Sequence, residues 1–198
     1  KSWENAGDVN TFKTLVGYKA DANRGKKYAQ ILRTKGTTFH FGAGEYVFGN
    51  ADNDRLTIDF NGANGSLYSE FTIQGGYPEN GGDETSSANV TTFSGDDTYG
   101  ILNVFDRARV HINDVTFADA LGTSITTEET DIHSVNLGAA LYMKQATTNK
   151  DKDKAAPRVW LTDCVFKNNV TNPSSGANTY IGGSAINLVH GAVYADHC

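Results

Sequence analysis

Three stretches of the chain can be laid over one another: Val110-His111-Ile112-Asn113-Asp114-Val115, Val159-Trp160-Leu161-Thr162-Asp163-Cys164 and Val193-Tyr194-Ala195-Asp196-His197-Cys198. In each, the first, third and sixth positions are apolar, an alternation typical of a strand with one buried face. A second alternating pattern precedes each copy, at residues 102–104, 141–143 and 186–188. Short strands that recur at irregular spacing predict a solenoid, a chain that winds repeatedly over itself with loops of variable length.

In a solenoid of parallel strands, identical positions of successive turns stack into ladders, and the inward residues form one continuous core. We therefore expect three inward ladders, made of Val110, Val159 and Val193, of Ile112, Leu161 and Ala195, and of Phe117 and Phe166.

Composition narrows the classes of function. The chain has 198 residues, of which 38% are hydrophobic, with 21 glycines and 3 prolines, which fits one domain of many short strands. A net charge of −6 without a basic stripe argues against nucleic acid and anionic membrane surfaces as partners. No apolar run is long enough to cross a bilayer. The chain starts at Lys1 without methionine and stops inside a repeat copy, so we expect a removed leader and coils that continue beyond residue 198.

Residues 1–36 differ from the rest of the chain and are predicted to form an N-terminal cap, with residues 37–198 as the coils. Tyr28, Ile31 and Leu32 follow the spacing of a short amphipathic helix. A solenoid must cover its first coil, because the apolar cross-section would otherwise meet water. Long loops are expected at residues 119–136, 144–158 and 170–182, and a turn at residues 42–46.

Two motifs near the end of the chain resemble a known family. Phe166-Lys167-Asn168-Asn169 fits the FxxN motif, and Gly182-Gly183-Ser184-Ala185-Ile186 is close to the GGAI motif. The pair is similar to the repeats of chlamydial-type polymorphic outer-membrane proteins. Independently of that resemblance, Gly183 and Ala185 suit a tight corner, and the amides of Asn168 and Asn169 suit a turn in which they satisfy backbone groups.

The front half resembles the opening of secreted right-handed parallel β-helix proteins of Gram-negative bacteria, which belong to a pectate-lyase-like superfamily. The matching segments are Ala43-Gly44-Glu45-Tyr46, Thr72 to Pro78 and Thr91 to Asp96. The resemblance, which covers about residues 28–198, implies an all-β, right-handed parallel β-helix with an N-terminal helical cap, exported to the outer-membrane surface or outside the cell. It does not select a function, because adhesins, autotransporter passengers and polysaccharide lyases share this architecture.

Cys164 and Cys198 occupy the same repeat position. They are expected to be stacked core thiols, because in-register side chains on parallel strands point the same way, which is poor disulfide geometry. A disulfide or a metal pair is the alternative.

Catalytic chemistry has weak support. Asp96 and Asp97 form an adjacent carboxylate pair in a glycine-rich stretch, and we interpret them as turn residues. A lyase acting on an acidic glycan would use Lys or Arg as the base, with Ca²⁺ or basic groups neutralising the uronate carboxylate. Arg109 and Arg158, with Arg107 and Lys144, are the candidates for such a basic stack. The acidic residues at 128–131 are interpreted as a solvated loop, so Ca²⁺ and other cofactors are not supported.

Exposed aromatic residues are the remaining candidates for binding. Tyr142, Trp160 and Tyr194 are predicted to point outward, where they could stack on sugar rings or contact a partner protein. His40 and His111 are also predicted to face outward, as ordinary surface residues.

The sequence therefore predicts a non-catalytic surface or secreted protein, adhesin-like or part of a surface assembly, that binds glycans or proteins through its loops and flank. An acidic-glycan lyase is the alternative, and a purely structural spacer is a third possibility.

Overall fold

The structure is a computed structural model that describes residues 3, 7–16, 37–49, 55–59, 69–105, 107–122, 139–144, 156–172 and 183–198. Its largest sheet has five strands in the order β1-β4-β7-β11-β15. The bounds of these strands are Thr37–Gly42, Ser69–Tyr77, Ala108–Asn113, Arg158–Thr162 and Ala192–Asp196.

The described residues also form two four-stranded sheets and one strand pair. One sheet has the order β14-β10-β6-β3, with bounds Ile186–Leu188, Leu141–Lys144, Leu102–Phe105 and Leu56–Asp59. The other has the order β12-β8-β5-β2, with bounds Val165–Lys167, Val115–Ala118, Thr91–Ser94 and Gly44–Val47. The pair is β13 and β9, at Val170–Thr171 and Leu121–Gly122.

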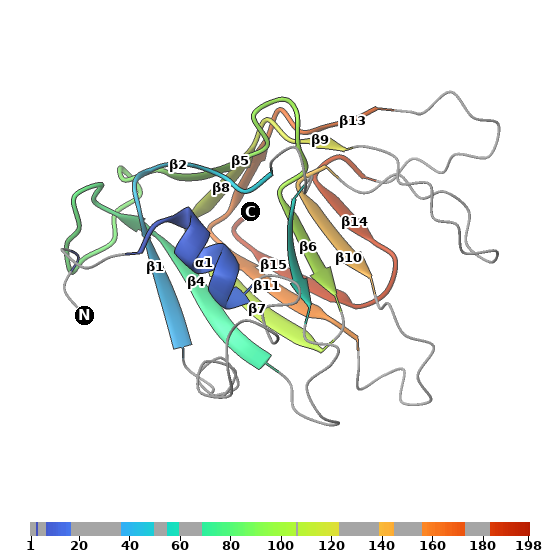
Figure 1. Ribbon diagram of the computed structural model, residues 1–198, viewed down its shortest axis with the longest axis horizontal. Coiled ribbons are helices and arrows are strands. Elements are labelled where there is room, and N and C mark those ends of the chain that lie inside the picture. Colours follow the sequence, from blue (N-terminus) through green and yellow to red (C-terminus); the bar gives the residue numbers. More distant parts are fainter. Residues whose placement is uncertain are drawn as a thin grey trace.

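All neighbouring strands in these sheets are parallel, and the chain visits the sheets in a fixed order (Figure 1). Strands β6, β7 and β8 enter one sheet each, and β10, β11 and β12 repeat that order. Successive passes of the chain therefore stack on one another, an arrangement compatible with a β-helix.

The strand register confirms the pairing of the three expected ladders, although Ala195, at the end of the second ladder, is exposed and not part of the core. Val110 lies opposite Val159, which lies opposite Val193, and the second ladder pairs its members in the same way. Phe117 lies opposite Phe166, with ring centroids 4.8 Å apart and nearly parallel planes. The core between the sheets is built from apolar side chains, and their burial supplies the main stabilisation.

Corners between strands carry residues in the left-handed backbone region. Asp114 follows β7 and Asp163 follows β11, with φ angles of 54° and 52°. Asp119 and Asn168 adopt the same left-handed conformation after β8 and β12. Asp and Asn tolerate this conformation better than other non-glycine residues, which explains why they recur at the strand ends.

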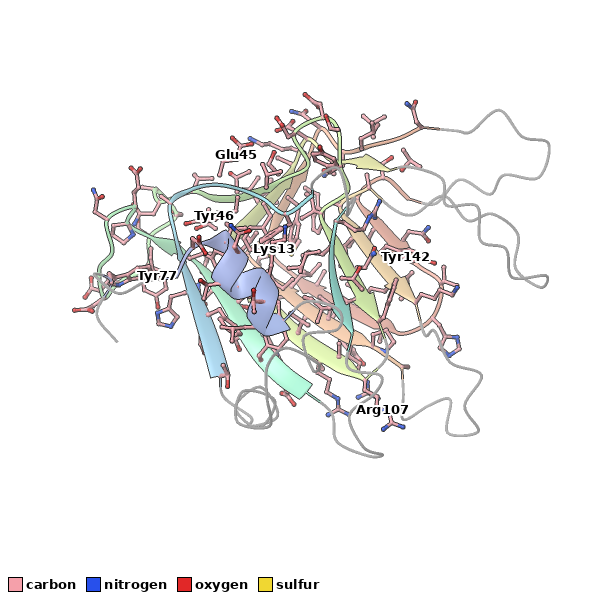
Figure 2. The ribbon with its side chains drawn as sticks, viewed as in Figure 1. Lys13, Glu45, Tyr46, Tyr77, Arg107 and Tyr142 are labelled. Atoms are coloured by element: carbon pink, nitrogen blue, oxygen red, sulfur yellow. The ribbon has the colours of Figure 1, made fainter. Side chains whose placement is uncertain are left out.

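Helix α1, at Val9–Val16, packs on the first strands through buried Phe12 and Val16. The Phe12 ring lies 5.0 Å from that of Phe41, and the Lys13 ammonium donates to the Phe48 carbonyl at 2.9 Å. Figure 2 labels Lys13 on this helix. The amphipathic helix predicted around residues 28–32 lies outside the described residues, and the division at residue 36 stays a prediction.

Asp8 caps α1, because its carboxylate accepts hydrogen bonds from the backbone N–H of Thr11 at 2.8 Å and from the Thr11 hydroxyl at 3.0 Å. These bonds hold the pKa of Asp8 below its ordinary value of 3.8. The cap therefore stabilises the folded state above pH 3.8, and the contribution is lost as pH falls through the lowered pKa. We expect Asp8→Ala to lower the melting temperature at pH 7, and the difference from the parent protein to vanish in strong acid. An unchanged difference across that range would show that Asp8 does not cap the helix.

Two local expectations need correction. Residues 44–46 were expected in a turn, but strand β2 begins at Gly44, whose φ of 139° brings the chain from β1 directly into the next sheet. Strands β9 and β13, which pair with each other, also begin inside two of the predicted long loops. At Gly183 a side chain would collide with the Ile186 carbonyl, so lack of space and not a positive φ favours glycine there.

Candidate functional site

The outward side of the five-stranded sheet gathers most of the candidate residues. Inward and outward side chains alternate along β7 and β11, and the outward ones stay partly exposed. We call the outward side chains of β4, β7, β11 and β15 the ladder face. In strand order they are Glu70, Thr72, Gln74, Arg109, His111, Asn113, Arg158, Trp160, Thr162, Ala192, Tyr194 and Asp196.

An aromatic stack runs across the middle of the ladder face. The ring centroids of His111 and Trp160 are 4.4 Å apart with planes 7° from parallel, and those of Trp160 and Tyr194 are 5.4 Å apart at 13°. Trp160 and Tyr194 thus lie together, as expected for equivalent repeat positions. Because both faces of the Trp160 indole are covered, a ligand on this face would meet the edge of the ring and its N–H group.

The Glu70 carboxylate contacts two basic side chains beside this aromatic stack. One of its carboxylate oxygens lies 3.1 Å from His111 Nε2, and the other lies 4.0 Å from an Arg109 guanidinium nitrogen. All three side chains are between 23% and 33% exposed. These interactions orient the three side chains. Because solvent screens them, they contribute little to the stability of the fold.

Arg158 lies in register with Arg109 on one side and with Ala192 on the other. Like charges directly opposite on neighbouring strands repel. Glu70 compensates Arg109, whereas no hydrogen bond or ion pair joins the Arg158 guanidinium to any residue that the structure describes. The partly exposed Arg158 therefore brings a positive charge to this face next to the aromatic stack.

An amide row forms the other border of the ladder face. Asn113 donates to the Gln74 side-chain oxygen at 3.0 Å, and the Gln74 amide donates to the Asp114 carboxylate at 2.6 Å. Side chains that hold one another in this way keep their remaining donors and acceptors in fixed positions.

Tyr142 is not part of this face, and the prediction that it is exposed is wrong. It belongs to β10 of another sheet, where only 3% of its surface is exposed and its ring meets the edge of Phe105 (Figure 2). Burial raises the pKa of Tyr142 to about 12, against the opposing effect of the Arg55 charge. The hydroxyl is therefore protonated and enclosed, so Tyr142 is not available to a ligand as a surface aromatic.

The basic stack is smaller than expected. Lys144 lies on the same sheet as Tyr142, in register with Phe105, and Arg107 precedes β7 at a corner with a φ of 31° (Figure 2). Only Arg109 and Arg158 are brought together. Asp96 and Asp97 form an exposed turn, as predicted, with φ angles of 52° and 50°.

The described ranges contain neither a metal-binding cluster nor a membrane-spanning helix. No group of three or more His, Cys, Asp or Glu side chains there could hold a metal ion. The acidic residues at 128–131 lie outside those ranges. No helix within the ranges combines the length and apolarity needed to cross a bilayer.

Of the two FxxN asparagines, Asn169 satisfies backbone groups as expected, whereas Asn168 bonds to a side chain. The Asn169 amide donates to the Phe117 carbonyl at 3.1 Å, and its oxygen accepts from the backbone N–H of Ala120 at 3.1 Å, which ties two passes of the chain together. Asn168 donates to the Asp119 carboxylate at 3.0 Å. Gly182 lies outside the described residues. The backbone of Ser184 and Ala185 accepts bonds from residues 140 and 141 beside Ile186.

We expect Asn169→Ala to lower the free energy of unfolding by about 1–3 kcal/mol, because it leaves a backbone donor and a carbonyl of buried residues without partners. Chemical denaturation followed by circular dichroism measures the change. Lys167→Ala, an exposed position on the preceding strand, is the control and should change stability little. Equal effects from the two substitutions would contradict the role of Asn169.

The two cysteines are free thiols, and their environments differ. Cys164 is buried and donates weakly to the Ile112 carbonyl at 3.4 Å, as expected for a core thiol. Burial raises its pKa to about 12, so it is not a nucleophile at neutral pH. Cys198 is exposed, which corrects the expectation that both side chains are buried.

Sequence reasoning missed Glu70, Gln74 and Asn113, and it treated His111 as an ordinary surface residue. Glu70 and His111 are 41 positions apart in the chain, and only strand register brings them together. The alternation Glu70, Thr72, Gln74 around the core residues Phe71 and Ile73 was the available signal, because it marks the outward side of a strand.

Comparison with known proteins adds no relative: no protein-family model, no curated protein and no solved structure matches the chain.

Proposed function

We propose that the chain forms a right-handed parallel β-helix with an N-terminal helical cap, and that it is a non-catalytic protein of the bacterial surface or the extracellular space whose ladder face binds a glycan. The stacked parallel sheets and the packing of α1 on their first strands support the architecture. The GGAI and FxxN resemblance supports the location.

One observation carries the binding function. The ladder face displays amides, hydroxyls, arginines and aromatic edges in register on four strands, and it includes no aliphatic side chain larger than Ala192. The core of a protein–protein interface is usually apolar, whereas ligands rich in hydroxyl groups are held by arrays of fixed donors and acceptors beside aromatic rings. A glycan fits this face better than a protein does.

The Arg109–Arg158 pair favours a second candidate, a lyase that acts on an acidic glycan. A guanidinium can pair bidentately with a uronate carboxylate, which is what substrate binding by such a lyase requires. Either function would use the same face and an acidic ligand.

A panel of neutral and acidic polysaccharides tests both proposals. Immobilised polymers report binding, and ultraviolet absorbance of unsaturated uronate products reports lyase activity. Saturable binding without new absorbance is the expected result. New absorbance with any acidic polymer would contradict the non-catalytic proposal and support the lyase. If no polymer binds and a protein from the surface of a host or neighbouring cell does, the glycan proposal is wrong.

A further inference from the structure

Opposite charges lie at the two ends of the ladder face. Arg158 is the first residue of β11, and Asp196 is the last residue of β15. Because Arg158 lies in register with Ala192, Asp196 is about 13 Å further along the strand direction, at about 3.3 Å per residue. We call the end with Arg158 the basic end of the ladder face and the end with Asp196 the acidic end.

Both charges can be reached by a ligand. Arg158 is partly exposed, and no hydrogen bond or ion pair holds its guanidinium within the part of the chain that the structure describes. The Asp196 side chain is 72% exposed, and one of its carboxylate oxygens lies 3.7 Å from His197 Nδ1. The His197 side chain is itself 77% exposed, so it leaves the other side of the Asp196 carboxylate open.

The other charged groups of this face preserve the separation. At the basic end, the Glu70 carboxylate lies 4.0 Å from the Arg109 guanidinium, and Arg107 adds a positive charge at the corner before β7. At the acidic end, Asp114 follows β7 and Asp163 follows β11. Equivalent residues stack at the same end because the strands are parallel, so the two ends keep opposite signs.

We propose that the ladder face takes a zwitterionic glycan, one that carries a carboxylate and an ammonium group on neighbouring sugar units. The inference rests on the proposed function, because it names the ligand class of the same face. The carboxylate pairs with the Arg158 guanidinium, whose planar fork can donate two hydrogen bonds to it. The ammonium group donates to the Asp196 carboxylate, which forms a second charge-assisted hydrogen bond.

The aromatic stack lies between these two contacts. Trp160 is two residues after Arg158 on β11, and Tyr194 is two residues before Asp196 on β15. Sugar rings that join the carboxylate to the ammonium group therefore cross the edges of these two side chains. The bound segment of the glycan runs along the strands, over β11 and β15.

Heparosan and its N-deacetylated form test this preference. Heparosan alternates glucuronate with N-acetylglucosamine, and removal of the acetyl groups frees the amines without changing the backbone. Binding is measured at a pH at which titration of the polymer shows its amines to be protonated. The second charge pair should raise the affinity for the N-deacetylated polymer about two- to fivefold over heparosan. Because both pairs are exposed, the difference should vanish in about 1 M sodium chloride.

Three variants assign the preference to its residues. Asp196→Asn should bind the two polymers equally, and Asp196→Lys should favour heparosan, a reversal that misfolding could not produce. Arg158→Gln should weaken the binding of both polymers by a similar factor. Lys167→Gln, at an exposed position on β12, is the control and should change neither affinity.

The outcomes separate the inference from the proposed function. Equal affinity of the parent protein for the two polymers overturns the inference and leaves glycan binding by the ladder face standing. A preference that survives both Asp196 substitutions also overturns it, because another group then recognises the amine. If neither heparosan form nor any polymer of the panel binds, the proposed function and the inference both fail.

Discussion

Phe117→Ala is expected to lower the free energy of unfolding by about 3–5 kcal/mol, the usual cost of removing a buried aromatic ring from a packed core. Phe117 is fully buried, its ring lies flat on Phe166 at 4.8 Å, and it meets the edge of Phe93 at 5.8 Å. The Phe117 ring contacts one ring from the preceding pass of the chain and one from the following pass. Its removal therefore leaves a cavity that the neighbouring strands cannot fill without shifting.

Guanidinium chloride unfolding followed by circular dichroism measures this loss. Val165→Ala is the matched control. Val165 lies on β12, the strand of the next pass that corresponds to β8, and 53% of its surface is exposed. It should change stability by less than about 0.5 kcal/mol. A loss below about 1 kcal/mol for Phe117→Ala would contradict the stacked arrangement of the sheets.

Trp160→Ala should weaken glycan binding about thirtyfold or more, as expected when an aromatic residue at the centre of a binding surface is truncated. Trp160 is the middle ring of the stack, so the substitution removes its own edge and also frees His111 and Tyr194 from their fixed orientations. Isothermal titration calorimetry with the tightest-binding polymer of the panel gives the change.

Two matched variants separate this loss from a general effect of aromatic substitution. Trp160→Phe keeps a flat ring in the stack and should retain more binding than alanine does. Tyr142→Phe alters an enclosed aromatic on another sheet and should leave binding unchanged. If Trp160→Ala binds as tightly as the parent protein, the ladder face is not the binding surface.

The strands and their ladders could be predicted because period-two alternation is local and because three copies of one pattern can be aligned by eye. Val110, Val159 and Val193 needed no tertiary information beyond that alignment. The same logic placed Trp160 and Tyr194 side by side, and Arg109 beside Arg158.

Other features depend on elements far apart in the chain. Tyr142 alternates with inward residues and so points away from the core, but alternation says nothing about whether the outer side of a sheet is covered, and here it is. Helix α1 has only eight residues, too few for a strong periodic signal. The role of Glu70 follows from the register between β4 and β7. The sequence does not specify this register, because a loop separates the two strands.

The ring planes were also beyond sequence reasoning. Equivalent positions on successive strands imply proximity, but not that the rings stack on one another and cover the faces that a sugar would otherwise meet. The structure therefore changes the expected mode of contact from ring faces to ring edges.

The indole N–H signals in a ¹H–¹⁵N spectrum test the central claim, that the ladder face is the binding surface, most directly. The protein has two tryptophans, and Trp3 serves as an internal control because its indole N–H donates to the Gly82 carbonyl at 2.8 Å. Saturation with the tightest-binding glycan should shift the Trp160 signal and leave the Trp3 signal in place. A Trp160 signal that stays unmoved at saturation would contradict the account.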